Sequence, residues 1–176
     1  MPASMTSVSL DVQGFADVEK ALDNLSKSAG KGVLRRSLKK AAQPTADLAA
    51  SLAPRKTGNL AKSIIVGTKL DGRQAKIHKK MFKDDKSAVT IFVGPSYLLG
   101  ANGRHGHLVE FGTAPHINGG QFAGSQHPGT AAQPFMRPAW EQDKMAMLER
   151  LKSELWSELE KSIKRADAKA ARAAMG

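Results

Sequence analysis

The sequence predicts an α+β fold with a small antiparallel sheet and helices around it. Short segments with strand-like alternation lie between residues 61 and 93, and long segments with helical spacing lie on either side of them. The length of 176 residues suits a single domain. We expect this domain to cover residues 1–163 and to be followed by a basic, Ala-rich tail over residues 164–176.

The first third of the chain predicts one strand and two helices. Residues 8–12 alternate apolar and polar side chains, which predicts a short strand. Apolar residues at helical spacing over 15–25 predict a helix that ends near Gly30. A second helix is expected over residues 33–53. Because Pro44 lacks an amide donor, we expect a kink or a break there.

The central segment predicts antiparallel strands. Residues 61–78 read as a β-hairpin in which Asp71 and Gly72 form the turn. Residues 89–93 alternate Val, Thr, Ile, Phe and Val, and this is the clearest strand signal in the chain.

Residues 87–136 are rich in turn residues and almost free of charge. They hold nine of the 16 Gly and four of the eight Pro, with two charged residues in all. We expect a long Gly/Pro-rich loop over about residues 94–136. A loop of this length in a small domain is usually functional, so we expect it to become ordered against another copy or another protein.

A long helix is predicted after this loop. Pro138 suits the first turn of a helix, and apolar residues recur every three or four positions from Leu148 to Ile163. The acidic side chains over residues 141–160 are interleaved with Lys and Arg, which predicts a solvated face.

The net charge of +11 lies entirely within residues 31–86, which hold 15 basic and four acidic residues. Such a stretch attracts a polyanion, and nucleic acid is the usual candidate. A solvated basic face is the alternative. Because Phe82 is the only aromatic residue in the stretch, any contact with DNA is expected to be with the backbone and indifferent to sequence. The residues of this predicted basic surface are Arg55, Lys56, Lys62, Lys69, Arg73, Lys76, Lys79, Lys80 and Lys83.

Enzymatic signatures are weak. The chain has no Cys, and it lacks the glycine-rich motifs of nucleotide-binding loops and of serine hydrolases. A metallohydrolase built on His105, His107, Glu110 and His116, with His127 nearby, is a third hypothesis. It is disfavoured because the leading histidines lie among glycines and no Asp is near to orient an imidazole. We therefore predict a protein that is not an enzyme and has no cofactor and no catalytic or metal site.

Three segments taken together resemble a known family. Residues 40–66 contain a helix with an internal Pro, then Ala-Pro, a basic pair and Thr-Gly-x-Leu. Residues 89–113 contain a strand ending in Val-Gly and a Glu-Phe-Gly-Thr block, and residues 133–140 contain Pro-Phe-x-Arg-Pro-Ala. In this order they resemble the neck or tail-completion family of long-tailed bacteriophages, the "gene product ten" head–tail joining proteins.

The resemblance implies a subunit with a small antiparallel sheet flanked by helices, which assembles into a homo-oligomeric ring at the head–tail junction. Such a ring joins the head connector or head-closure protein to the tail terminator or tail tube and lets DNA pass. It implies a structural role without turnover and a location in the virion, after assembly in the bacterial cytoplasm. No signal peptide or membrane span is predicted from the sequence.

The matched motifs suggest roles for single residues. Gly58 is expected to permit a turn from helix to strand, Leu60 to pack under the sheet, and Phe135 to anchor the core or an interface. Glu110 is expected to pair with a basic group, with a simple exposed carboxylate as the alternative. The residues proposed for interface or structural motifs are Pro54, Thr57, Gly58, Leu60, Glu110, Phe111, Gly112, Thr113, Phe135, Arg137 and Pro138.

Overall fold

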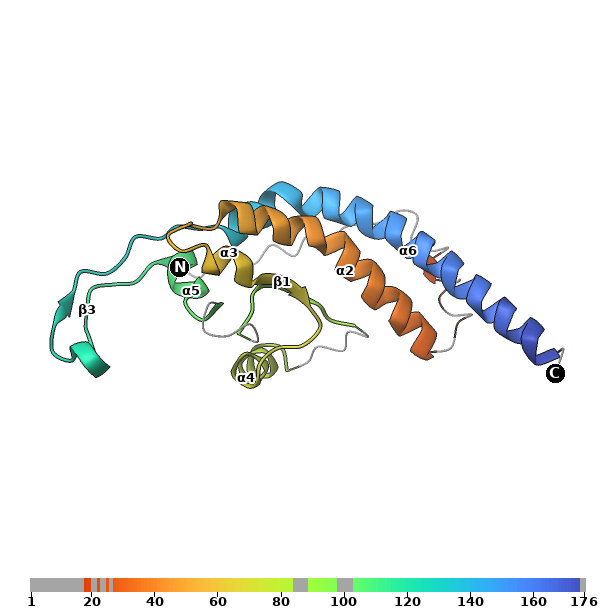
Figure 1. Ribbon diagram of the computed structural model, residues 1–176, viewed down its shortest axis with the longest axis horizontal. Coiled ribbons are helices and arrows are strands. Elements are labelled where there is room, and N and C mark those ends of the chain that lie inside the picture. The colour runs from red at the N-terminus through yellow and green to blue at the C-terminus, as the bar shows by residue number, and fades with distance from the viewer. Residues whose placement is uncertain are drawn as a thin grey trace.

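A computed structural model gives the fold of the chain and describes residues 18, 19, 22, 25, 27–83, 89–97 and 103–174. Two long helices lie side by side as an elongated arch, and a two-stranded sheet and a short helix lie beneath it (Figure 1). A thin arm projects from one end of the arch, and the C-terminal helix ends at the other. The predicted α+β class is confirmed.

The arch is an antiparallel pair formed by α2 (Lys27–Leu52) and α6 (Met136–Ala174). The two helices can approach closely because most of the buried side chains of α2 are those of Ala. Helix α2 begins before the predicted residue 33 and runs through Gly30, which was expected to end the preceding helix. A Cβ at Gly30 would meet the carbonyl oxygen of Leu22 at an ordinary contact distance of 3.9 Å, so this glycine is compatible with the helix interior.

Pro44 does not break α2, which is continuous from Lys27 to Leu52. The neighbouring helix α6 makes polar contacts on both sides of the proline. The Arg150 guanidinium donates hydrogen bonds to the Ala41 carbonyl at 3.2 and 3.1 Å, and Thr45 donates to the Asp143 carboxylate at 2.5 Å. Of the kink or break that was expected, the break is wrong, because α2 continues through Pro44 while packed against α6.

The sheet pairs β1 (Ile64–Gly67) with β2 (Phe92–Pro95) in antiparallel register, Ile64 opposite Pro95 and Val66 opposite Val93. A short helix, α3 (Asn59–Ser63), leads directly into β1. The strand predicted over residues 89–93 is observed as β2, which begins three residues further along the chain, and its partner is β1.

The predicted hairpin over residues 61–78 is wrong in its second half, which forms helix α4 (Gly72–Met81). Asp71 begins the helix rather than a β-turn, because its carboxylate accepts the Gln74 amide at 2.7 Å as an N-cap. The strand alternation rested on Ala75 and Ile77 alone, within a run of residues that favour helices.

The loop expected over residues 94–136 contains short elements. These are α5 (Gly106–Phe111), β3 (His116–Ile117), the 3-10 turn η2 (Gly120–Phe122) and β4 (Gln126–His127). Pro138 lies in the first turn of α6, as predicted. Helix α6 runs through residue 163 to Ala174, so the predicted tail continues the helix as far as the structure describes it.

Two apolar clusters hold the arch together. The first joins α2, the sheet and the start of α6 around Phe135, Ile64 and Val66, with several Ala side chains of α2. The second lies further along the arch, where Val33 meets Leu155 and Leu159. Val18 is buried in the second cluster, but the strand predicted over residues 8–12, and most of the helix predicted over 15–25, lie outside the described residues.

Candidate assembly interface

Glu110 joins the short helix α5 to the start of α6. Its side chain is buried, and its carboxylate accepts the amides of Phe135 and Met136 at 2.8 and 2.9 Å and that of Arg137 at 3.0 Å. Burial alone would raise the pKa of Glu110, but these three amides and the Arg137 charge lower it below its usual value. The partner is thus the N-terminus of a helix, whose free amides attract an anion, rather than the basic side chain that we expected.

This contact brings together two motifs that are 25 residues apart. Phe111, next to Glu110, lies under the Arg137 guanidinium, whose carbon is 5.7 Å from the ring centre. Phe135 is completely buried in the first apolar cluster, and Pro138 is half-buried in the first turn of α6. Phe135 is therefore part of the subunit's own core.

The Thr-Gly-x-Leu motif forms the turn from α2 into α3. Gly58 precedes α3 with φ +70°, a conformation that favours glycine. The expected turn from helix to strand is wrong in this detail, because Gly58 leads into the short helix α3 and the strand begins only at Ile64. The Thr57 hydroxyl accepts the Asn59 amide at 3.4 Å, and Leu60 packs against the first apolar cluster. Pro54 is half-buried at the end of α2. The structure thus places this motif within the subunit body.

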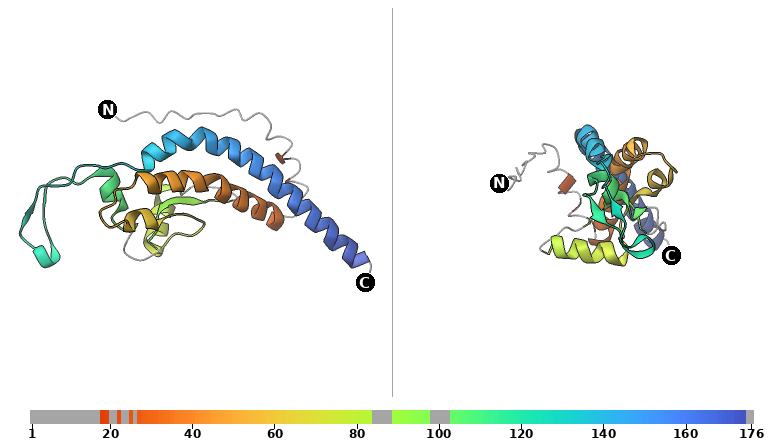
Figure 2. Two further views of the ribbon diagram at one scale, coloured as in Figure 1. Left: turned by 45° about the horizontal axis from the view of Figure 1, so that its top comes forward. Right: turned by 90° about the vertical axis from the view of Figure 1, so that its left-hand side faces the viewer.

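Residues 113–130 form the projecting arm, which Figure 2 shows extending past α5 and the first turn of α6. Its base is closed by reciprocal backbone hydrogen bonds of 2.9 and 3.1 Å between Thr113 and Thr130. Gly112 and Gly129 flank this base with φ +73° and +87°. A Cβ on either glycine would meet a carbonyl oxygen of the opposite strand at 2.6 or 2.4 Å, so only glycine fits.

The arm is held by contacts within itself. The rings of His116 and His127 stack with centres 4.9 Å apart, and the Asn118 amide donates to the Ser125 hydroxyl at 2.9 Å. No residue of the arm belongs to either apolar cluster of the described chain. At its tip Ile117 is 70% exposed and Phe122 is 67% exposed. The arm is also free of charge, since no Asp, Glu, Lys or Arg occurs between Phe111 and Met136.

An apolar groove of about 710 Å³ runs along the body beside the base of the arm. Helix α2 contributes Leu38 to its lining, α6 contributes Trp140 and Met147, and β2 contributes Val93. Phe111 and Trp140, which are 66% and 47% exposed, also line it. The sequence analysis missed this groove, although Met136, Trp140, Met147 and Leu151 recur at helical spacing and mark an apolar stripe on α6.

The predicted basic surface divides into two groups. Arg55, Lys56 and Lys62 lie around α3, whereas Lys69 and Lys83 flank α4, which itself carries four exposed cations. Helix α4 is held by the ring of His78 against Phe92, with centres 5.1 Å apart, and it has no acidic residue. The cations on α4 are Arg73, Lys76, Lys79 and Lys80.

The histidines considered as metal ligands are dispersed. His105 and His107 are exposed at the start of α5, whereas His116 and His127 stack in the arm, and the carboxylate of Glu110 is occupied by three amides. Within the described part of the chain, no group of three or more His, Asp or Glu side chains is placed to hold a metal ion.

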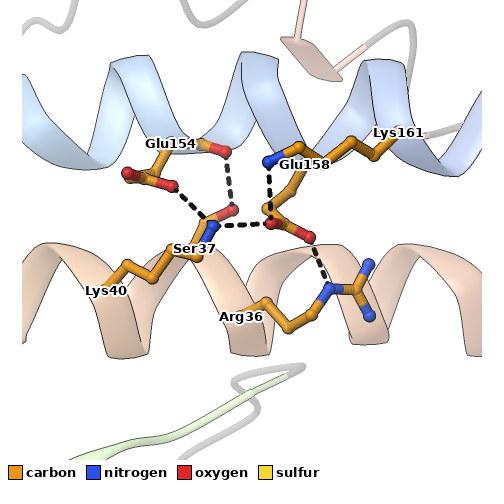
Figure 3. Close-up of polar contacts among 6 residues, drawn as sticks. All are labelled: Arg36, Ser37, Lys40, Glu154, Glu158 and Lys161. Atoms are coloured by element: carbon orange, nitrogen blue, oxygen red, sulfur yellow. Dashed lines mark hydrogen bonds and ion pairs between the residues drawn. The ribbon is translucent and has the colours of Figure 1, made fainter.

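A second buried carboxylate, Glu158, locks α2 to α6. Figure 3 shows it between Lys40, whose Nζ lies 2.7 Å from Oε1, and Arg36, whose Nε lies 2.5 Å from Oε2. Lys40, and then Arg36, lower the pKa of Glu158 to about 2. The Ser37 hydroxyl donates to the Glu154 carbonyl at 3.1 Å in the same layer. The prediction of a solvated acidic face is thus wrong for Glu158, because Lys40 and Arg36 approach it from another helix, in addition to Lys161 of α6 at 3.6 Å.

Comparison with known proteins gives one family. The family described as "Bacteriophage HK97-gp10, putative tail-component" matches residues 16–112, from the N-terminal segment to the end of α5. Neither a curated protein nor a solved structure gives a significant match to the chain. In the described residues, no helix combines the length and the apolar character that a bilayer span requires.

Proposed function

The chain belongs to the HK97-gp10-like family of bacteriophage tail components, and from this premise we propose that it is a structural protein of the head–tail junction. Copies of the chain would form a ring that joins the head connector to the tail terminator or tail tube and leaves a passage for DNA. The family match carries this proposal. The projecting, uncharged arm supports it, because an apolar surface that the body does not cover is typical of an assembling subunit.

A particle-assembly experiment tests the proposed role. A phage that lacks this gene should accumulate DNA-filled heads and separate tails, because the ring that joins them is missing. Electron microscopy of lysates would show this, and the wild-type gene supplied in trans should restore joined particles. Normal numbers of infectious, joined particles without the gene would refute the proposal. Joined particles with tails of abnormal length would place the protein in the tail instead.

Contact with DNA is a second proposed function, and the cations of α4 favour it. Four cations on one short helix, without an acidic neighbour on that helix, suit the phosphate backbone of a duplex. If four phosphates are neutralised, affinity should fall roughly 100-fold between about 50 and 200 mM salt.

The paired substitution Lys76→Glu with Lys80→Glu tests this DNA contact. It should abolish most duplex binding in an anisotropy titration and reduce the salt slope by about 2. Lys164→Glu with Lys169→Glu, on the exposed end of α6, is the matched control and should bind nearly as the wild type does. Equal losses from both pairs would mean that only net charge matters, and α4 would not be a specific contact surface.

A further inference from the structure

We propose that the arm of one copy lies in the apolar groove of the next copy. Ile117 and Phe122 of the arm would pack against Phe111, Trp140 and Met147 of the neighbour. This inference rests on the ring proposed above and adds which two surfaces build the contact. It assigns an occupant to the groove and a partner to the arm.

The arm has the chemistry of a segment that inserts into an apolar site. It carries no charged side chain, so no ion loses its hydration when the arm enters the groove. Its two large apolar side chains, Ile117 and Phe122, are exposed in the single chain. Its backbone is held by its own pairing at Thr113 and Thr130, so it is already ordered before it meets a partner.

The groove offers a matching surface. Its walls come from α2, α6 and β2, and the large side chains of Phe111 and Trp140 leave much of their surface uncovered. The charged groups that line it are already engaged, because Glu110 binds the α6 amides and Arg137 lies over the Phe111 ring. A neutral arm therefore suits this groove better than a charged segment does.

The arm and groove are different surfaces of one subunit, so their contact is heterologous. Repeated heterologous contacts give a closed ring if the rotation from each subunit to the next adds up to a full turn, and they give a filament otherwise. Figures 1 and 2 show the arm extending beyond the end of the body, away from α2 and α6, whose side chains line the groove. This direction suits a neighbouring groove rather than the chain's own.

Cysteine cross-linking between two variants tests the contact, and the natural absence of Cys makes each introduced thiol unique. Ala123→Cys places a thiol at the arm tip and His107→Cys places one on the groove lining, and both positions are exposed. Mixed in equal amounts and treated with a short bismaleimide, the two variants should form a covalent mixed dimer. In the control, Ala168→Cys, on the exposed end of α6, takes the place of His107→Cys. This pair should give at least tenfold less of the covalent mixed dimer.

A charge substitution adds a second measurement. Phe122→Asp should remove self-association in native mass spectrometry while leaving the helical circular dichroism signal unchanged. Met81→Asp, at a 70% exposed apolar residue of α4, is the matched control and should keep the oligomer. If the free protein is monomeric, the same cross-links are sought in assembled particles.

The outcomes separate this inference from the proposed ring. Oligomers that persist in Phe122→Asp and give no mixed dimer would overturn the arm–groove contact and leave the ring in place. A protein that is neither oligomeric nor present in particles would refute the ring itself. An intrachain bridge between Ser7→Cys and His107→Cys in one variant would assign the groove to the chain's own N-terminal segment and would also overturn the inference.

Discussion

At the scale of single residues, two buried carboxylates fix the geometry of the subunit. Glu110 binds three amides at the start of α6, and Glu158 binds two cations of α2. Each is a charged group out of water whose hydrogen-bond partners come from another element. Removing the charge therefore leaves partners unsatisfied, which costs more than the net value of the contact itself.

Glu110→Gln should lower the free energy of unfolding by about 2 kcal/mol. The amide oxygen can still accept hydrogen bonds, but the NH₂ group faces backbone donors, and the charge that stabilises the N-terminus of α6 is lost. Urea denaturation followed by circular dichroism measures the change. Glu141→Gln, at an exposed ion pair within α6, is the control and should change stability by less than about 0.5 kcal/mol. Equal effects would contradict the buried role of Glu110.

The low pKa of Glu158 predicts a loss of stability in acid. The folded-state pKa of about 2 is below the ordinary value of 4.5, so Glu158 binds its proton more readily in the unfolded chain. Its contribution is complete above pH 4.5 and is lost as the pH falls towards 2. We expect this loss to be about 1 kcal/mol, because Arg36 and Lys40 are partly exposed and solvent screens the pair.

Unfolding titrations at several pH values check this. The wild type should lose more stability between about pH 5 and pH 2.5 than Glu158→Gln does, because the variant has no carboxylate left to protonate. Glu160→Gln, at an exposed residue two positions away, should keep the wild-type dependence. A steep acid dependence that survives in Glu158→Gln would show that other groups cause it.

At the scale of elements, α4 illustrates how a capping residue can be mistaken for a turn. Asp-Gly is a strong hairpin signal, but Asp is also a strong N-cap, and the residues after the pair distinguish the two uses. Here the run after Gly72 is rich in Lys, Arg, Gln and Ala, which favour a helix. The true partner of β1 lies about 28 residues further along, and such non-local pairing leaves no signal in the sequence.

Asp71→Ala should weaken α4 by about 1 kcal/mol, because the Gln74 amide loses its acceptor. Hydrogen exchange read by mass spectrometry should show about fivefold faster exchange in residues 72–81, with little change in α2 or α6. Asp47→Ala is the control, because Asp47 accepts only an exposed hydrogen bond from Gln43 in the middle of α2. Unchanged exchange in α4 would mean that its contacts with β2, such as the packing of His78 on Phe92, hold the helix without the cap.

Other elements could be predicted because their signals are local. The apolar seam and Pro138 mark α6, and the Ala-rich run marks most of α2. The candidate interface was predictable only in part. Its Gly-rich, uncharged segment is visible in the sequence, but the groove forms from three elements distant along the chain. Glu110 could be singled out from the sequence as a residue that needs a partner. That its partners are the backbone amides at the start of α6 could not be predicted, because this depends on how α5 and α6 lie relative to each other in the fold.

At the scale of the whole molecule, the described residues of the body and the arm share no apolar cluster. Both apolar clusters lie in the arch and the sheet, and the arm contributes to neither among the described residues. The backbone hydrogen bonds between Thr113 and Thr130 close the arm at its base. The two chain segments that enter and leave the arm are therefore joined at the edge of the body. A subunit divided in this way can form its core alone and use the arm for assembly.

Excision of the arm tests this division. Replacing residues 114–129 by Asn-Gly keeps the bridge between Thr113 and Thr130 and closes it with a two-residue turn. The free energy of unfolding should stay within about 0.5 kcal/mol of the wild type, because no core contact is lost. Thermal unfolding measures this, and small-angle scattering should show a shorter maximum dimension. Phe135→Ala, which empties the centre of the first cluster, should instead cost about 3–5 kcal/mol. If the excision destabilises the protein as much as Phe135→Ala does, the arm belongs to the folding unit and the division is wrong.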